Sequence, residues 1–403
     1  MRNLRVSVGV GAVVIALLGT ACGQSDGGES TKGSTGPVEQ VPAGPVVAAA
    51  DLDQFSAALL REVSKEQPEN VVVSPASLAL AFALAEAGAQ GATRDEIRSV
   101  FGFDQRSDIS AVLTAITAPP ISGAPVLSVA NGVWDTGRRS IDASYKATVQ
   151  DTLKSELSTV PYPQLAKAVN SWVSDQTKGR ITDLVPDAAV NIDTVAILVN
   201  AIYLLAKWQY PFRDDGAQAF AGAGMVPMMS VEAAFQIAEG DGYRAIRLPY
   251  QGGTVSMLIV VPDNITSFDP ARLTDVRTGL GSTTQVQLTM PTWDFATQLA
   301  AKSTLSRLGI TTAFTGRADF CPMITGSCQA GDMRISEVFH QANITVDTEG
   351  TEAAAATAIV IEGVSARIDE PRTFTVDRPF LFEIVHEATG TPLFIGRVVN
   401  PAA

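Results

Sequence analysis

Histidine is nearly absent from this chain of 403 residues, in which only His340 and His386 occur. The chain has three cysteines, and neither a C-x-x-C nor an H-E-x-x-H spacing is found. Because zinc and related sites need such ligands at short spacing, we expect no metal site, and no motif indicates another cofactor. The G-x-S-x-G turn of many serine hydrolases is also missing, as is a clear nucleophile and base pair. We therefore predict that the protein is not an enzyme.

Positive charge is also in short supply, since 29 lysines and arginines accompany 42 aspartates and glutamates, for a net charge of −13. This balance argues against nucleic-acid binding and against attraction to an anionic membrane surface. No internal repeat is found, and no Pro/Gly-rich linker divides the body of the chain. The Gly- and Ala-rich stretch 216–224 is short, so we interpret it as a surface loop.

The first 22 residues have the layout of an export signal. Arg2 and Arg5 precede an apolar run at residues 6–18, and small residues lead from this run to Cys22. The run is too short for a standard membrane span. Cys22 after small residues resembles a bacterial lipobox, in which the cysteine is lipidated and becomes the first residue, although Gly19 stands where a leucine is usual. We predict lipidation of Cys22, with ordinary secretion after cleavage nearby as the alternative.

Residues 23–45 are dominated by Gly, Ser, Thr and Pro without hydrophobic periodicity, which is typical of a flexible tether. We accordingly divide the chain into a signal peptide at 1–21, a lipid-anchored linker at 22–50 and one folded domain at 51–403. The expected location is the outer face of the cell membrane, through the lipid on Cys22, or the medium as a secreted protein.

The two remaining cysteines, Cys321 and Cys328, enclose the short sequence P-M-I-T-G-S. In an oxidising compartment two such cysteines can close a small loop, and Pro322 and Gly326 allow a turn between them. We predict a structural disulfide here, with a pair of unpaired thiols as the alternative.

Segment 347–357, with the sequence D-T-E-G-T-E-A-A-A-A-T, carries contradictory signals. Thr351 could cap a helix, and Glu352 with four alanines favours one, whereas residues 358–364 prefer a strand. In a strand, the face that begins with Thr351 is small or apolar throughout, while Glu352 and Glu362 lie on the other face. Such a face can be buried in a sheet without burying a charge, so the segment is a candidate conformational switch. A surface helix or a linker is the alternative interpretation.

Segment 347–357 resembles the reactive-loop hinge of the serpins. Other segments resemble other parts of the same family, such as N-V-V-V-S-P-A-S at 70–77 and L-V-N-A-I-Y at 198–203. Serpins are protease inhibitors that insert their own loop into a sheet. The resemblance implies an α+β serpin fold: one mixed domain with a large central sheet, two smaller sheets, eight or nine helices and an exposed reactive loop. The further matches follow in family order at 88–97, 168–173, 177–184, 247–262, 377–384 and 392–401.

Local patterns fit this fold. Apolar runs predict strands, and amphipathic runs predict helices. The strands are expected at 196–204, 245–249, 255–261, 286–290, 343–346 and 380–385, and the helices at 52–65, 78–87 and 166–176.

The resemblance also implies a function: irreversible inhibition of extracellular serine proteases. The protease attacks the loop, forms an acyl-enzyme, and is carried along as the loop becomes a new strand. Gly350 would be the pivot, because it alone in the hinge accepts a positive φ without strain. Thr348 departs from the glutamate that many inhibitory members carry. The implied hinge consists of Glu349, Gly350, Thr351, Glu352, Ala353, Ala354, Ala355, Ala356 and Thr357.

The loop length usual in the family, counted from Glu349 and Gly350, places the scissile bond at Val364–Ser365. A small β-branched residue there suits a shallow apolar primary pocket, so the expected target is elastase-like, within the elastase/chymotrypsin-like class. The alternative bond, Arg367–Ile368, would suit a trypsin-like enzyme but would lengthen the inserted strand by three residues.

Four polar residues match the serpin shutter, a buried cluster that can hold two strands together and re-pair when they part. These are Ser74, Ser77, Asn200 and His340. The expected partner of the protein, taken as a monomer, is a serine protease in a covalent acyl complex. A non-inhibitory serpin-like binding protein, whose loop is a substrate or a ligand surface, is the other function that stays open.

Overall fold

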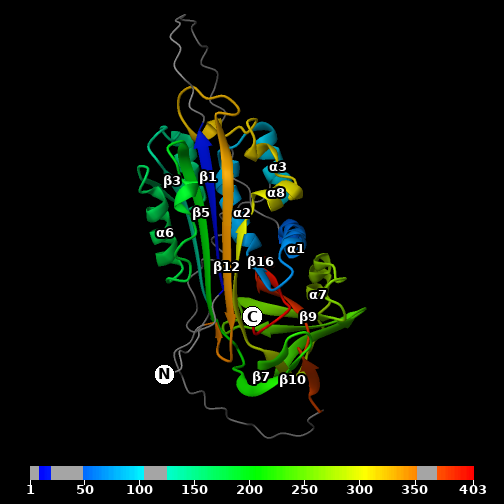
Figure 1. The fold of residues 1–403 in the computed structure, drawn as a ribbon. Coiled ribbons are helices and arrows are strands. Elements are labelled where there is room, and N and C mark those ends of the chain that lie inside the picture. Colours follow the sequence, from blue (N-terminus) through cyan, green and yellow to red (C-terminus); the bar gives the residue numbers. More distant parts are fainter. Residues whose placement is uncertain (1–8, 20–48, 104–124, 352–369) are drawn as a thin grey trace, which may run out of the picture.

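The computed structural model describes residues 9–19, 49–103, 125–351 and 370–403. These ranges hold two large sheets and seven α-helices in an elongated arrangement (Figure 1). The predicted α+β class is confirmed, with seven α-helices in the described ranges where eight or nine were expected. Segment 104–124 lies outside these ranges.

The first sheet, called here the central sheet, has seven strands in the order β11-β12-β1-β5-β3-β4, with β13 paired to β5. β5 is apolar on both faces and almost wholly buried, because helices cover the sheet on both sides. The strands are β11 (Trp293–Ala300), β12 (Met333–Val346), β1 (Gly9–Gly19), β5 (Thr194–Lys207), β3 (Val126–Asp135), β4 (Glu156–Thr159) and β13 (Gly350–Thr351).

The helix α2 (Pro75–Ala87) lies between the two sheets. All thirteen of its residues are buried, as expected for a helix that is apolar all round. It begins after Ser74, whose hydroxyl accepts the Ser77 amide, and Pro75 takes the first helical position, where no amide is needed. It packs against β1 and β5 on one side and against β16 on the other.

The opposite face of the central sheet is covered by α6 (Leu165–Gln176), which contacts β3 and β5 (Figure 1). Among the helices that the structure describes, none combines the length and apolarity needed to cross a membrane. The other helices are α1 (Ala49–Glu66), α3 (Gly91–Phe101), α5 (Ala143–Ala147), α7 (Leu273–Thr278) and α8 (Lys302–Leu308).

The second sheet has nine strands in the order β14-β10-β7-β8-β9-β15-β16-β2, with β6 paired to β7. Two smaller sheets were expected, and this detail is wrong, because the 17-residue β7 pairs with β10 and β6 along one part and with β8 along another. The strands are β14 (Arg372–Thr375), β10 (Thr283–Pro291), β7 (Gly224–Gly240), β8 (Tyr243–Pro249), β9 (Val255–Pro262), β15 (Phe380–His386), β16 (Thr391–Val398), β2 (Val71–Val73) and β6 (Arg213–Phe220).

Every strand and helix expected from the local patterns lies within an observed element of the same type. One local expectation is wrong: segment 216–224 is not a surface loop. It forms the end of β6 and the turn into β7, in which Gly222 and Gly224 adopt positive φ angles of 86° and 78°. Glycine-rich composition therefore marked a tight hairpin here.

The N-terminal apolar segment lies where nothing in the sequence led us to expect it. Gly9–Gly19, part of the expected export signal, forms β1 in the middle of the central sheet, between β5 and β12. The predicted processing of residues 1–21 stays a prediction, and the structure adds a strand position that the sequence did not suggest.

Candidate functional site

The candidate site is the strand position between β5 and β12, called here the central slot, together with the turn that leads into it from β12. This turn follows β12 directly at Asp347. The Asp347 carboxylate accepts the Glu349 amide at 2.9 Å, and Asp347 and Gly350 form an antiparallel bridge. Burial raises the pKa of Asp347, while amide donors of the turn act in the opposite direction. The turn sends the chain back along β5.

Trp208, just after β5, fixes this turn in place. Its indole Nε1 donates to the Asp347 carbonyl at 2.9 Å, and its amide donates to the Glu349 carbonyl at 3.2 Å. The indole is 1% exposed and stacks on Tyr250, with 4.5 Å between the ring centroids and 8° between the planes. Trp208 thus holds the turn through one indole and one backbone hydrogen bond, and the stacking on Tyr250 keeps its ring in place.

Gly350 is where the turn approaches β5 most closely. Its φ angle is +116°, which residues with a Cβ rarely adopt. A Cβ at this position would lie 2.5 Å from the Trp208 nitrogen and 2.6 Å from the Ala206 carbonyl oxygen. Only glycine therefore fits between the turn and β5.

The first hinge residues have entered the central sheet. In β13, Gly350 pairs with Lys207 and Thr351 pairs with Ala206, antiparallel to β5. β1 then starts opposite Leu204 and runs in the same direction. Two segments far apart in sequence therefore lie end to end along β5.

The pairing also defines where a longer hinge strand would lie. If it continued from Thr351 along β5 without a bulge, residue 353 would face Leu204, which is the β5 partner of Gly9. The Asp347–Gly350 bridge places residue 353 opposite Ile344, which is the β12 partner of Gly9. The two edges of the slot thus give the same register independently.

The four expected shutter residues come together beneath the slot. Ser74 donates its amide to His340 Nε2 at 3.1 Å and its hydroxyl to the Leu393 carbonyl at 2.7 Å. Ser77 donates its hydroxyl to Asn200 Oδ1 at 2.5 Å. His340 lies on β12 and Asn200 on β5, so the start of α2 connects the two edges of the slot through the Ser77 amide and the Ser74 hydroxyl.

This set of hydrogen bonds reaches across the strand position that β1 occupies. β1 separates the two strands, with Val13 opposite both His340 and Asn200. Asn131 on β3 extends the cluster by accepting from Asn200 Nδ2 at 2.5 Å. The four shutter residues are at most 1% exposed, and such a buried network keeps its strands together only while its members stay paired.

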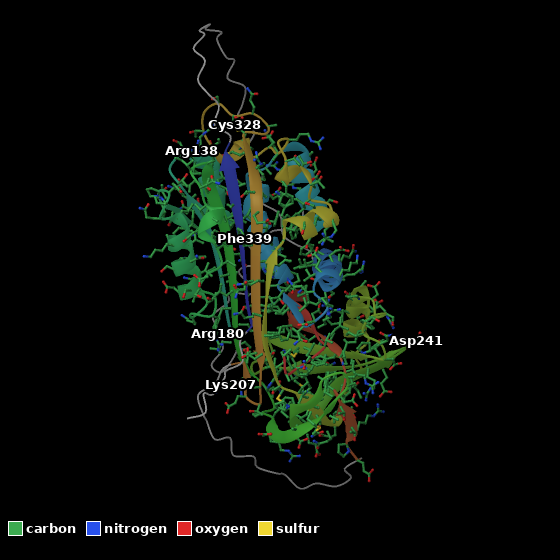
Figure 2. The ribbon with its side chains drawn as sticks, viewed as in Figure 1. Arg138, Arg180, Lys207, Asp241, Cys328 and Phe339 are labelled. Carbon is green, nitrogen blue, oxygen red and sulfur yellow. A yellow bond between two sulfur atoms is a disulfide. The ribbon has the colours of Figure 1, made fainter. Side chains whose placement is uncertain are left out.

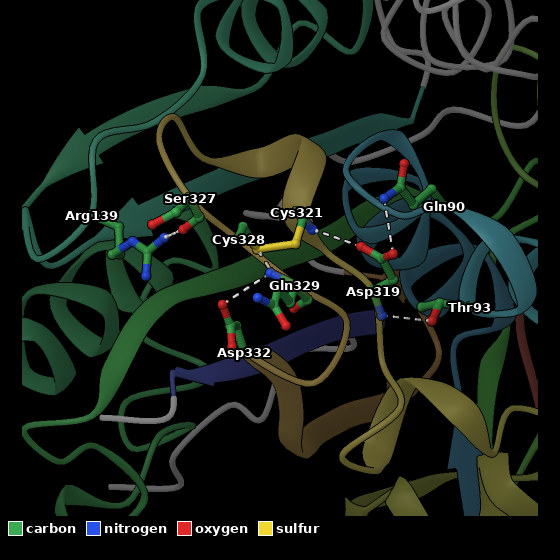
Figure 3. The surroundings of a disulfide bond; sticks show 9 residues. All are labelled: Gln90, Thr93, Arg139, Asp319, Cys321, Ser327, Cys328, Gln329 and Asp332. Atoms are coloured by element: carbon green, nitrogen blue, oxygen red, sulfur yellow. Dashed lines mark hydrogen bonds between the residues drawn. A yellow bond between two sulfur atoms is a disulfide. The ribbon is translucent and has the colours of Figure 1, made fainter. Parts of the chain in front are cut away.

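The predicted disulfide is confirmed: Cys321 and Cys328 are bonded, with 5.5 Å between their Cα atoms. Asp319 ties this loop to the start of α3, because its carboxylate accepts from Gln90 Nε2 at 2.9 Å and its amide donates to the Thr93 hydroxyl at 2.9 Å (Figure 3). On the other side Arg139 donates to the Ser327 carbonyl at 2.7 Å (Figure 3). The loop is a brace at the end of the central sheet.

Several predicted site residues lie outside the described ranges. Sequence reasoning, in turn, missed Trp208, Asp347 and Asn131. Trp208 carried a usable signal, since this large aromatic residue directly follows a long apolar strand and precedes the sequence Q-Y-P-F. The predicted residues outside the described ranges are Cys22, Glu352, Ala353, Ala354, Ala355, Ala356, Thr357, Val364, Ser365, Arg367 and Ile368.

Comparisons with known proteins point to one family. The sequence model of the family described as "Serpin (serine protease inhibitor)" matches residues 50–401. Serpin-Z2A of Oryza sativa subsp. japonica is 31% identical over 85% of this chain and 94% of its own length. The leukocyte elastase inhibitor of Sus scrofa is 30% identical over 86% of this chain and 98% of its own. The crystal structure of Serpin48 from the insect Tenebrio molitor matches with a TM-score of 0.72 at 27% identity, covering 86% of this chain and 96% of that one.

Proposed function

The chain belongs to the serpin family of serine protease inhibitors, and from this premise we propose that it is an irreversible suicide inhibitor of elastase- or chymotrypsin-like serine proteases. The reactive loop would be attacked by the protease and would then insert into the central slot. The observation that carries the proposal is the pairing of Gly350 and Thr351 with β5, because it starts the loop at the edge and in the direction that insertion requires.

Family membership confirms the prediction that the chain is not an enzyme, since serpins are protease inhibitors and generally target serine proteases. The chemistry belongs to the protease. Its serine oxygen forms an ester with the Val364 carbonyl carbon as the Val364–Ser365 amide bond breaks, and Ser365 leaves with a free amino group. Insertion then carries the ester and the attached protease along the sheet.

The length of the central slot supports the proposed bond. β1 fills the slot with eleven residues, from Gly9 to Gly19. In the register defined above, the same eleven positions would take residues 353–363, so the inserted strand would end directly before Val364. A bond at Arg367 would leave three more residues to place beyond the end of the slot.

The same register brings a hydroxyl to the shutter. Thr357 would lie opposite both Asn200 and His340, where Val13 lies in β1. Twelve newly inserted residues, 352–363, each contributing roughly 0.5 to 1.5 kcal/mol of net hydrogen-bond stability, would supply on the order of 10 kcal/mol. A free energy of that size is sufficient to distort the active site of a bound protease.

Elastase-like specificity is supported by the small β-branched Val364 and by the likeness to a relative named as an elastase inhibitor. Trypsin-like specificity at Arg367 is the alternative. We further propose that the protein is a monomer held at the outer face of the cell membrane by a lipid on Cys22, with residues 22–50 as the tether, or else secreted.

A non-inhibitory binding protein is the second candidate function. One observation favours it: β1 fills the slot that the reactive loop would need. The two functions are separated by what happens to a protease after it has cleaved the loop.

The test uses protein purified after export and mixed with pancreatic elastase, and separately with trypsin. We expect a denaturant-stable band at the summed mass with elastase, and a released C-terminal peptide that starts at Ser365 by mass spectrometry. Val364→Arg is the matched control and should move the complex from elastase to trypsin without changing the peptide. Clean cleavage by both enzymes without a stable band contradicts the inhibitory function, and a peptide starting at Ile368 moves the bond to Arg367.

A further inference from the structure

The N-terminal segment occupies the strand position that insertion needs. β1 pairs with β12 on one edge and with β5 on the other, antiparallel to both (Figure 1). A strand has only two hydrogen-bonding edges, and β1 uses both of them. A second strand therefore cannot enter between β5 and β12 while β1 is seated there.

β1 lies in the register of the reactive loop and not at some other offset. Gly9 has the same partners on β5 and β12 that residue 353 would have, as derived above from two independent pairings. β13 ends opposite Ala206 and β1 begins opposite Leu204, so Leu205 alone separates the two pairings. Along β5, the pairing with β1 thus begins directly after the pairing with β13 ends.

β1 also matches the loop in the pattern of its side chains. Ile15 and Leu17 are 0% exposed and join the hydrophobic core on the α2 face, while Ala16 is 0% exposed and joins the core on the α6 face. In the same register, residues 359–361 of the loop take these three positions and read I-V-I. Two large apolar residues would again point to the α2 face, and the residue between them to the α6 face. Ser336 donates its hydroxyl to the Ala16 carbonyl at 3.0 Å, where β12 bulges.

We propose that β1 is an internal competitor of the reactive loop, so that a chain retaining residues 9–19 in the slot is cleaved by proteases without trapping them. This inference rests on the proposed function, because only an inserting loop has a competitor. The same apolar run is the core of the predicted export signal. Its removal at export opens the slot, and inhibition is thereby tied to the arrival of the protein outside the cell. The precursor spares the serine proteases of the cell that makes it.

The experiment uses the full chain from cell-free translation, in which residues 1–21 stay attached. Ile15→Asp places a carboxylate at a wholly buried position and should expel β1 from the slot. Ile15→Val keeps the position apolar, and Leu4→Asp adds the same charge ahead of β1. Each protein is titrated against elastase, and the amount of inhibitor consumed per trapped protease is measured.

We expect Ile15→Asp to gain trapping although it removes a buried apolar side chain from a central strand. It should need about tenfold less inhibitor per trapped elastase than the unchanged chain, because the slot is vacated in most molecules. Ile15→Val and Leu4→Asp should behave like the unchanged chain. Equal trapping by all four proteins overturns the inference.

Amide hydrogen exchange provides a readout that does not depend on inhibition. Amides of residues 9–19 should be protected in the unchanged chain and exposed in Ile15→Asp. Rapid exchange in the unchanged chain overturns the inference even if the variants differ in trapping. If exported protein traps elastase but Ile15→Asp does not, the inference that β1 competes with the loop is wrong and the proposed function stands. If neither traps, both are wrong, since no insertion exists to compete with.

Discussion

The two ends of β12 are held by different kinds of bond. Before Met333 the chain passes through the Cys321–Cys328 loop, which is closed covalently and tied to the neighbouring helix. After Val346 the chain turns at Asp347 and is held by hydrogen bonds to Trp208. Figure 2 shows Cys328 at the first end of the sheet and Lys207, the partner of Gly350, at the second.

The difference shows which end of the strand can change its pairing. Hydrogen bonds can be exchanged one at a time, each for about 1 kcal/mol, whereas a disulfide is permanent in an oxidising compartment. The hinge end can therefore extend into the slot while the other end keeps β12 in place.

The largest effect on protease trapping is expected at the entrance of the slot, for Thr351→Arg in the exported protein. Thr351 pairs with Ala206, which is 2% exposed, so an arginine there brings a charge to a buried part of the sheet. We expect insertion to slow about 100-fold, equivalent to about 2.7 kcal/mol in the barrier, with folding and cleavage preserved. Denaturing gels should show cleaved protein in place of the complex. Thr351→Ser is the control, and a complex of undiminished yield in Thr351→Arg would contradict loop insertion.

Gly350→Val probes the hinge end without adding charge. Its Cβ would lie 2.5 Å from the Trp208 backbone nitrogen and 2.6 Å from the Ala206 carbonyl oxygen, and its φ is positive, so we expect a loss of about 3 kcal/mol in the free energy of unfolding. The matched control is Gly222→Val, where φ is +86° and a Cβ would meet nothing within 4 Å. Urea unfolding measures both. Equal losses in the two variants would show that the close approach to β5 contributes nothing.

The covalent end is tested by replacing both cysteines, in Cys321→Ser/Cys328→Ser. Opening a loop of this length should lower the free energy of unfolding by about 2.5 kcal/mol. Trapping of protease should persist, because the hinge end is unchanged. Reduction of the unchanged protein should give the same loss in urea unfolding. Loss of trapping at full stability would mean that the two ends do not act separately.

The smallest effect is expected away from β12, at a buried ion cluster in which Arg277 binds both Asp53 and Glu383. Burial raises the pKa of Glu383 to about 7, against the attraction of Arg277. The folded state therefore favours the protonated carboxyl of Glu383. The stability that this protonation contributes is complete below pH about 4.5 and is lost as the pH rises through 7. Between pH 6 and pH 8 this loss amounts to about 1 kcal/mol.

Glu383→Gln should remove most of that pH dependence in urea unfolding, because the amide does not ionise. Glu239→Gln makes the same change on an exposed residue and should leave the dependence as it was. A slope that is the same in both variants would place the titrating group elsewhere.

The fold itself was implied by the family resemblance, whereas the types and places of many helices and strands could be predicted because their signals are local. The continuous apolar run of β9 and the all-round apolar surface of α2 each predict a buried element of the right type. The union of the smaller sheets could not be predicted, because it depends on which strands β7 meets along its length. That is a matter of long-range pairing.

The site divides in the same way. Gly350 and the small residues after it could be recognised from their types and spacing, and the shutter residues from the family resemblance. The role of Trp208 depends on its position under a turn 139 residues later in the chain. The place of β1 depends on a slot formed by β5 and β12, so residues 9–19 read by themselves indicate only export.

The length of the central slot gives the size of the force that the proposed inhibitor would exert on a protease. Residues 351–363, extended along the slot, would cover about 43 Å at about 3.3 Å per residue. Spread over that path, about 10 kcal/mol corresponds to a mean pulling force of about 15 pN. The protease would arrive at the Met333 end of the slot, where Gly19 lies in β1. The Cys321–Cys328 loop precedes Met333 in the chain, so the trapped protease would come to rest at the covalently closed end of the sheet.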